Sequence, residues 1–93
     1  MTISVDGQSE TDRILRGVLQ DVLGLAPERT AAFGPQTGLF GHLPELDSMA
    51  VAGLLTEIED RLDIVIEDDE VDGEMLETYG ALLGFVEAKR GER

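Results

Sequence analysis

The sequence Leu46-Asp47-Ser48-Met49 decides how this chain is organised, and a helical run from Ala50 to Leu62 follows it directly. Asp47 is a candidate N-cap for that helix, because its carboxylate can accept a hydrogen bond from a free backbone N–H of the first turn. The Ser48 hydroxyl then lies near the positive end of the helix dipole, where a phosphate ester is well tolerated. Taken alone, the Asp-Ser pair is equally typical of an ordinary helix cap.

The helix behind Ser48 has two largely uncharged faces. At about 100° per residue, one face forms an ordinary core stripe of Val51, Leu54, Leu55, Ile58 and Leu62. The opposite face, where a surface helix usually carries charge, holds small or apolar residues followed by acids: Met49, Ala52, Gly53, Thr56, Glu59 and Asp60. This second face starts beside Ser48, and it indicates a helix on which other proteins dock.

The size and charge of the chain restrict its function. A chain of 93 residues is one domain. It buries about 60–65% of its unfolded surface, which suits a modest core and no deep enclosed active site. The net charge is −13, and residues 45–93 contribute −11 through fifteen acids and four bases. Such a chain repels nucleic acid and anionic membranes and attracts basic protein surfaces, which excludes nucleic-acid binding.

The sequence lacks the signals of secreted and membrane proteins. It contains no cysteine, which fits a reducing compartment and excludes a disulfide framework. Residues 1–8 lack the basic start and apolar run of a signal peptide. The longest apolar run, from Met49 to Leu55, is too short to cross a bilayer. We therefore expect a soluble, cytoplasmic monomer with no membrane insertion.

A second helix and a long loop precede the central helix. Ser9 or Thr11 is expected to cap a helix that runs to about Leu23, with Gly24 as its C-cap. Residues 25–44 are rich in Gly and Pro and are predicted to form a loop. The side chains expected to anchor this loop to the core are Leu39, Phe40 and Leu43.

The last third of the chain is predicted to end in a helix. Residues 63–66 are expected to form an extended connection, since no partner strand is visible for this β-branched segment. Residues 67–70 are acidic and exposed, and residues 71–77 form one or two turns. Thr78 then caps a helix that ends near Arg90 and supplies core residues Tyr79, Leu82, Leu83, Phe85 and Val86.

These elements predict an all-α fold, a small antiparallel bundle of three main helices plus one short helix, with a long loop between the first two helices. We expect residues 1–9 to form a flexible N-terminal tail. Residues 10–90 form the helical bundle, and residues 91–93 form a C-terminal tail.

The motif, the acidity and the helix order together resemble the acyl carrier protein family, and the resemblance runs from about Glu10 to Arg90. In that family the serine after the aspartate carries a 4'-phosphopantetheine arm, which holds acyl groups as thioesters. The resemblance implies that a phosphopantetheinyl transferase attaches this arm from coenzyme A to Ser48, beside the helix cap Asp47. The run from Pro44 to Val51 is also similar to stand-alone carriers associated with exosortase and polysaccharide loci in bacteria.

The resemblance further implies a partner-binding face and a specialised pathway. Carriers of fatty-acid synthesis usually place acids at the positions that Ala50 and Gly53 occupy here. Loss of these acids predicts weak recognition by general fatty-acid enzymes and a dedicated set of acyl-loading ligases and acyl-transferring enzymes with basic docking surfaces. The residues implied to bind such partners are Met49, Ala52, Gly53, Thr56, Glu59 and Asp60.

Three other functions compete with that of a carrier. A hydrolase would need Ser48, His42 and Asp47 as a triad, but Ser48 lacks a Gly-x-Ser-x-Gly context and His42 is expected to be a loop residue near the attachment site. We therefore expect no enzyme. An unmodified acidic adaptor that binds a basic partner through the helix over residues 48–62 stays as the competing class.

The third alternative is a metal site in the acidic segment after the central helix. Residues 68–79 partly match a calcium-binding loop, but Tyr79 stands where the loop needs a bidentate glutamate. A weak divalent site at Asp68, Glu70 and Asp72 remains an alternative, and a solvated acidic turn is the favoured interpretation.

The uneven charge yields a prediction about salt. Because the like charges of residues 67–77 repel one another, added salt or millimolar divalent cations should raise the melting temperature. Thermal unfolding followed by circular dichroism checks this. Sodium and magnesium should act equally at matched ionic strength if screening is the cause, whereas an excess effect of magnesium or calcium would indicate a specific site. A melting curve that no salt changes would contradict the repulsion argument.

Overall fold

The computed structural model describes residues 9–91. The tails expected over residues 1–9 and 91–93 lie outside this part of the chain, except for Ser9 and Gly91. The bundle of three main helices is confirmed. The elements follow in the order α1 Glu10–Leu23, α2 Pro27–Ala31, α3 Ser48–Leu62, the 3-10 turn η1 Asp68–Glu70 and α4 Tyr79–Gly91.

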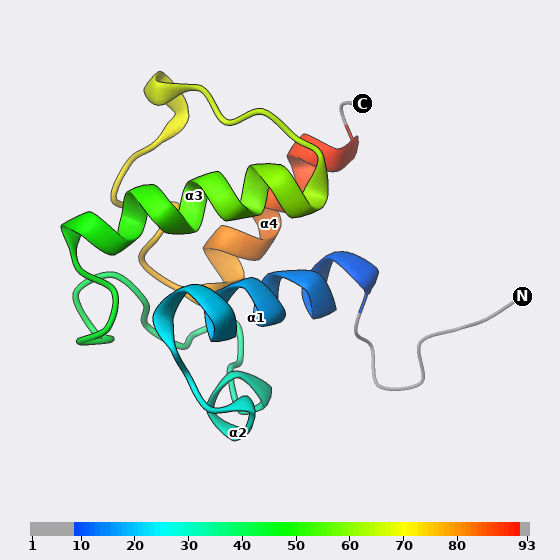
Figure 1. Ribbon diagram of the computed structural model, residues 1–93. Helices are drawn as coiled ribbons and strands as arrows, with labels where there is room; N and C mark the ends of the chain where they lie inside the picture. Colours follow the sequence, from blue (N-terminus) through cyan, green and yellow to red (C-terminus); the bar gives the residue numbers. More distant parts are fainter. Residues whose placement is uncertain (1–8, 92–93) are drawn as a thin grey trace, which may run out of the picture.

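Helix α1 is the central element of the bundle, because it packs against α2, α3 and α4. Figure 1 shows α1 and α3 side by side and running in opposite directions, with α2 in the long connection between them. Within residues 9–91, the buried hydrophobic core is aliphatic apart from Phe33, Met75 and Tyr79, and the half-buried Phe85 packs against it. Within residues 9–91, no helix combines the length and the hydrophobicity needed to cross a membrane.

The ends of α1 are those that the sequence predicted. Ser9 is the N-cap, and its hydroxyl accepts a hydrogen bond from the Asp12 N–H at 3.1 Å. Gly24 is the C-cap and adopts a left-handed conformation with φ of 69°. The apolar side chains that α1 buries recur at helical spacing: Leu15, Val18, Leu19 and Leu23.

Two expectations for residues 25–44 are wrong in detail. The segment contains the short helix α2, which starts with Pro27 at its first turn and shows no apolar period that could have predicted it. Thr30 of α2 is buried, and its hydroxyl bonds to Gln20 of α1 at 3.0 Å. Among the expected anchors, Leu39 is fully buried and Leu43 is half-buried, but Phe40 is 40% exposed.

The connection from α3 to α4 is held to both helices. Residues 64–66 form no helix or strand, as predicted, and Ile64 is buried. Asp63 was expected in the same extended connection but is the left-handed C-cap of α3, with φ of 55°. The Ile66 N–H donates to the Glu59 carboxylate at 2.7 Å, which ties the segment to α3. At η1, the Glu70 carboxylate accepts hydrogen bonds from the Glu67 N–H and from Lys89 of α4, which together lower the pKa of Glu70. The turns expected over residues 71–77 are present at 73–77.

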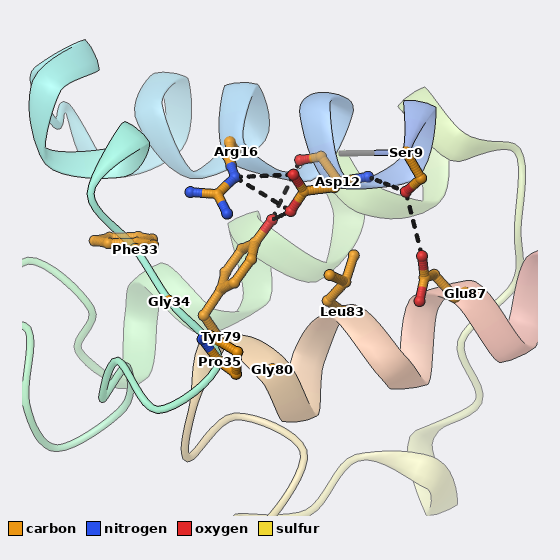
Figure 2. Close-up of a pocket in the computed structure, with 10 residues that line it drawn as sticks. All are labelled: Ser9, Asp12, Arg16, Phe33, Gly34, Pro35, Tyr79, Gly80, Leu83 and Glu87. Carbon is orange, nitrogen blue, oxygen red and sulfur yellow. Dashed lines mark hydrogen bonds and ion pairs between the residues drawn. The ribbon is translucent and has the colours of Figure 1, made fainter. Parts of the chain in front are cut away.

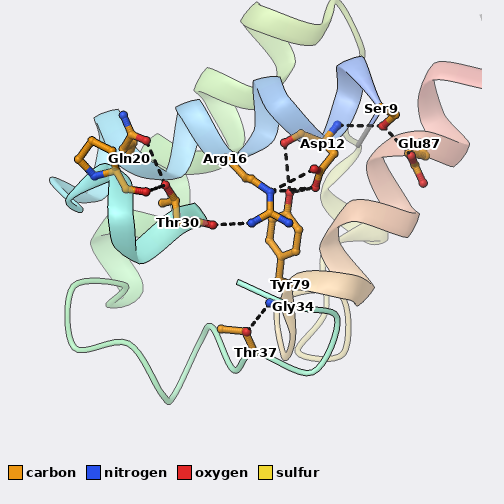
Figure 3. A network of polar contacts seen from close by, with 10 residues as sticks. Ser9, Asp12, Arg16, Gln20, Thr30, Gly34, Thr37, Tyr79 and Glu87 are labelled. Carbon is orange, nitrogen blue, oxygen red and sulfur yellow. Dashed lines mark hydrogen bonds and ion pairs between the residues drawn. The ribbon is translucent and has the colours of Figure 1, made fainter. Parts of the chain in front are cut away.

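A buried polar contact joins α1 to α4. Figure 2 shows the Tyr79 side chain pointing from the start of α4 toward α1, where its hydroxyl donates to Oδ1 of Asp12 at 2.5 Å. The Arg16 Nε donates to both Asp12 oxygens at 3.1 Å, and its guanidinium lies 4.7 Å from the centre of the Tyr79 ring. Figure 3 shows Arg16 also reaching the Thr30 carbonyl of α2. Asp12 is therefore a buried carboxylate whose charge is balanced in place.

Tyr79 and its neighbour also fix the long connection through the backbone. The Tyr79 N–H donates to the Thr37 carbonyl at 2.8 Å, and the Gly80 N–H donates to the Pro35 carbonyl at 3.0 Å. A Cβ at Gly80 would lie 2.8 Å from that same carbonyl oxygen, so the close approach requires glycine. Gly38 and Thr78 form an isolated antiparallel bridge beside these bonds.

Tyr79 allows a direct optical test, because it is the only tyrosine and the chain has no tryptophan. Burial and the hydrogen bond to Asp12 raise the pKa of Tyr79 far above its ordinary value near 10. The unfolded chain ionises near pH 10 and the folded chain does not, so stability is complete below pH 10 and falls as the pH rises further. Absorbance at 295 nm should stay at the phenol value until helical circular dichroism is lost, whereas a urea-unfolded control titrates near pH 10.

Removal of the same hydroxyl should cost measurable stability. Tyr79→Phe leaves Asp12 buried with one donor fewer, which should lower the free energy of unfolding by about 1–3 kcal/mol. Urea unfolding measures this. The matched control is Asp21→Asn on the exposed face of α1, which should change stability by less than about 1 kcal/mol. Equal effects of the two variants would contradict the role given to the buried contact.

Candidate phosphopantetheine attachment site

Asp47 ends the long connection and begins α3. Its backbone is extended, with φ of −99° and ψ of −178°, and its carboxylate accepts a hydrogen bond from the Ala50 N–H at 2.8 Å. Its carbonyl accepts the first helical bond, from the Val51 N–H at 3.1 Å. Leu46, the residue before it, is buried in the core. The chain therefore enters α3 at a position that Leu46 and Asp47 fix together.

Ser48 is the first residue of α3, and its side chain is exposed. The N–H groups of a first helical turn carry partial positive charge and favour an anion. The first turn of α3 contains no acidic residue that would oppose one. A phosphodiester on the Ser48 oxygen would thus meet solvent and the positive end of the helix, and the site fits the prosthetic group that the sequence predicted.

Three shallow hollows meet at Ser48. The first, the loop-side hollow, has a volume of about 460 Å³ and is lined by residues 40–44 and 46–48. The second, the α3 groove, has about 380 Å³ and lies between α3 and residues 66–71. The third has about 240 Å³ and is mostly apolar, with Phe40 and Val51 facing residues 71–76. A group attached at Ser48 can therefore lie along the protein surface in more than one direction.

Phe40 is a residue whose position the sequence did not reveal. It was expected in the core, yet it stands beside Ser48 and lines both the loop-side hollow and the apolar hollow. Its N–H donates to the Leu76 carbonyl at 2.9 Å, which fixes its backbone. An aromatic residue in a Gly-rich loop gives no periodic signal, so only the three-dimensional structure assigns it to the site.

Most residues of the expected partner face lie on the surface of α3. The side chain of Met49 is 86% exposed. Glu59 differs from the others, because it is half-buried and its carboxylate holds the Ile66 N–H. The Glu59 carboxylate is therefore partly engaged within the protein and less available to a partner. The exposed members of the face are Met49, Ala52, Gly53, Thr56 and Asp60.

The residues that a hydrolase or a metal site would use are not arranged for that chemistry. The Asp47 carboxylate caps α3, and His42 is an exposed loop residue whose ring lies against Gly38. Within residues 9–91, no group of three or more His, Cys, Asp or Glu side chains is placed to hold a metal ion. In the acidic segment, Glu70 binds Lys89, and the Asp72 carboxylate accepts a hydrogen bond from the Met75 N–H.

A fourth hollow lies away from Ser48. It has about 560 Å³ and contains the Asp12, Arg16 and Tyr79 contact (Figure 2). It shares no residue with the three hollows at Ser48. Within residues 9–91, no buried side-chain nitrogen or oxygen lacks a hydrogen-bond partner. The polar groups in this hollow thus bond to one another, which indicates a structural role.

Comparison with known proteins agrees with this geometry. Residues 13–86 match the family model described as a phosphopantetheine attachment site. The fold is similar to the solution NMR structure of a holo acyl carrier protein from Nitrosomonas europaea, with a TM-score of 0.80 and 38% sequence identity. That alignment covers 89% of this chain and 99% of the other. No protein with a curated description matches the chain.

The chain belongs to the phosphopantetheine-attachment family and has the fold of an acyl carrier protein. It is a carrier domain and not an enzyme, and the group it carries is a covalently attached 4'-phosphopantetheine. Proteins of this class work with phosphopantetheinyl transferases and acyl-handling enzymes. The family match therefore favours a modified carrier over the unmodified acidic adaptor.

Proposed function

We propose that Ser48 carries the 4'-phosphopantetheine and that the protein presents acyl or related thioesters from this position to a dedicated set of partner enzymes. The observation that carries the proposal is the exposed Ser48 hydroxyl at the first residue of α3, inside the region that matches the attachment-site family. When bound, the prosthetic group supplies the thiol that holds the acyl group.

The residues around Ser48 support attachment without taking part in the chemistry. Asp47 fixes the start of α3 by capping the Ala50 N–H, and the buried Leu46 holds the preceding segment to the core. The Ser48 hydroxyl supplies the oxygen that is modified, and the first turn of α3 stabilises the phosphodiester charge. Exposure of Ser48 gives the transferase access to the oxygen.

We infer further that the exposed face of α3 binds the partners. Met49 offers an apolar side chain next to Ser48, and Ala52, Gly53 and Thr56 let another backbone approach closely. Asp60 attracts a basic partner surface, which raises the rate of association more than the affinity. The uncharged first turn of α3 supports partners with a less basic docking surface than those of general fatty-acid synthesis, and thus a specialised pathway.

The attachment proposal is tested by intact mass. Coexpression with a broad-specificity phosphopantetheinyl transferase should add one phosphopantetheine to the protein, and Ser48→Ala should abolish this addition completely. The variant should fold normally, because Asp47 still caps α3. Ser9→Ala is the matched control and should be modified fully. Modification that survives in Ser48→Ala would refute the assignment.

The partner proposal is tested by adding a charge on the face of α3. A Cβ at Gly53 meets no atom within 4 Å, so Gly53→Glu is tolerated and should speed loading by general fatty-acid ligases about twofold to tenfold. Gly84→Glu on α4, where the space is also open, adds the same charge elsewhere. Kinetics of loading measure both variants. Efficient loading of the unmodified sequence, or equal gains in both variants, would contradict a specificity role for this face.

A further inference from the structure

A phosphodiester on Ser48 would add negative charge to a part of the chain that has almost no positive charge. From Thr30 to Asp60 the sequence contains no Lys or Arg, but it contains five acids. The acids are Glu45, Asp47, Glu57, Glu59 and Asp60. The helix dipole offsets part of the added charge, but its effect is limited to the first turn. His42 is the one side chain of this stretch that can become a cation.

The structure places His42 and Ser48 in the wall of the same loop-side hollow. The His42 N–H donates to the Leu39 carbonyl at 2.9 Å, which fixes the backbone in a tight turn. The ring is also positioned, because a Cβ at Gly38 would lie 2.4 Å from its Cγ atom. The side chain is exposed, and within residues 9–91 its imidazole has no hydrogen-bond or ion-pair partner. The His42 ring thus lines the same hollow as Ser48, and within residues 9–91 no protein group competes for its nitrogens.

We propose that the imidazolium of His42 binds the phosphodiester of the prosthetic group on Ser48 and holds the base of the arm on the loop-side hollow. The inference rests on the attachment proposed above and assigns a residue to the anion that attachment creates. The contact requires the charged form of the imidazole, so lower pH favours it and higher pH releases it.

Other titratable groups near His42 do not account for the same effect. Asp47 lines the same hollow, but its carboxylate caps the Ala50 N–H and is present with or without the prosthetic group. Glu45 binds Arg29 at 2.6 Å, and this hydrogen bond lowers the pKa of Glu45. Glu77, whose carbonyl bonds the Leu39 N–H, is exposed on the adjoining segment. Since His42→Gln leaves all three carboxylates in place, a pH dependence that this variant removes reports His42.

The experiment uses the phosphorus nucleus and the single histidine as independent reporters on the full-length protein. Intact mass first shows that the prosthetic group is attached, and the ³¹P resonance of the phosphodiester is then followed from pH 5 to 8. A phosphodiester has no titration of its own in this range. We expect its resonance to titrate together with the His42 ring protons. The midpoint of the ring should lie about 0.3–0.8 pH units higher in the modified protein than in the unmodified one.

Two variants separate this contact from a general effect of pH. His42→Gln keeps a polar side chain without the charge, so the ³¹P resonance should become independent of pH. His42→Lys keeps a cation throughout the range and should also remove the titration. A ³¹P resonance that does not titrate in the modified wild-type protein, or that still titrates in His42→Gln, would overturn the inference. Absence of the added mass would refute the attachment at Ser48 itself, and this inference with it.

Discussion

The bundle depends on Tyr79, which joins α4 to α1 and to the long connection between α1 and α3. The Tyr79 hydroxyl bonds to Asp12 of α1, and its N–H bonds to Thr37 of the long connection. Its ring packs on Phe33 at a centroid distance of 5.8 Å. A small domain buries little apolar surface, so one residue that closes three segments at once contributes a large share of their mutual order. The cost is a buried carboxylate, which Arg16 balances.

The position of Ser48 follows from this constraint. Because the backbone of residues 35–40 is bonded to the region that begins α4, the connection cannot move freely before it reaches Asp47. Two consecutive turns, closed by the bonds from Leu43 to Leu39 and from Leu46 to Leu43, then lead into α3. The exposed serine is therefore held by ordered backbone on one side and by a helix on the other. Such support suits the attachment residue proposed above, which partner enzymes would have to reach at a fixed position.

Sequence patterns predicted the parts of the fold that repeat at a helical period. The caps at Ser9 and Asp47 and the stripes of α1, α3 and α4 could be derived because periodicity and cap chemistry are local. Helix α2, the exposure of Phe40 and the Asp12 to Tyr79 contact could not, because they depend on segments distant in sequence. The partial burial of Glu59 could not be predicted for the same reason, since its hydrogen bond from the Ile66 N–H forms only when the chain folds back on α3.

The exposed face of α3 contributes little to the bonds that hold the protein together. The buried side chains of α3 lie on its other side, and the polar contact of Asp12, Arg16 and Tyr79 shares no residue with the hollows at Ser48. Met49, Ala52 and Gly53 are therefore not among the residues whose contacts stabilise the fold. Evolution can vary these positions with little loss of stability, so descendants of one bundle can diverge in the surface they offer while the scaffold beneath stays the same.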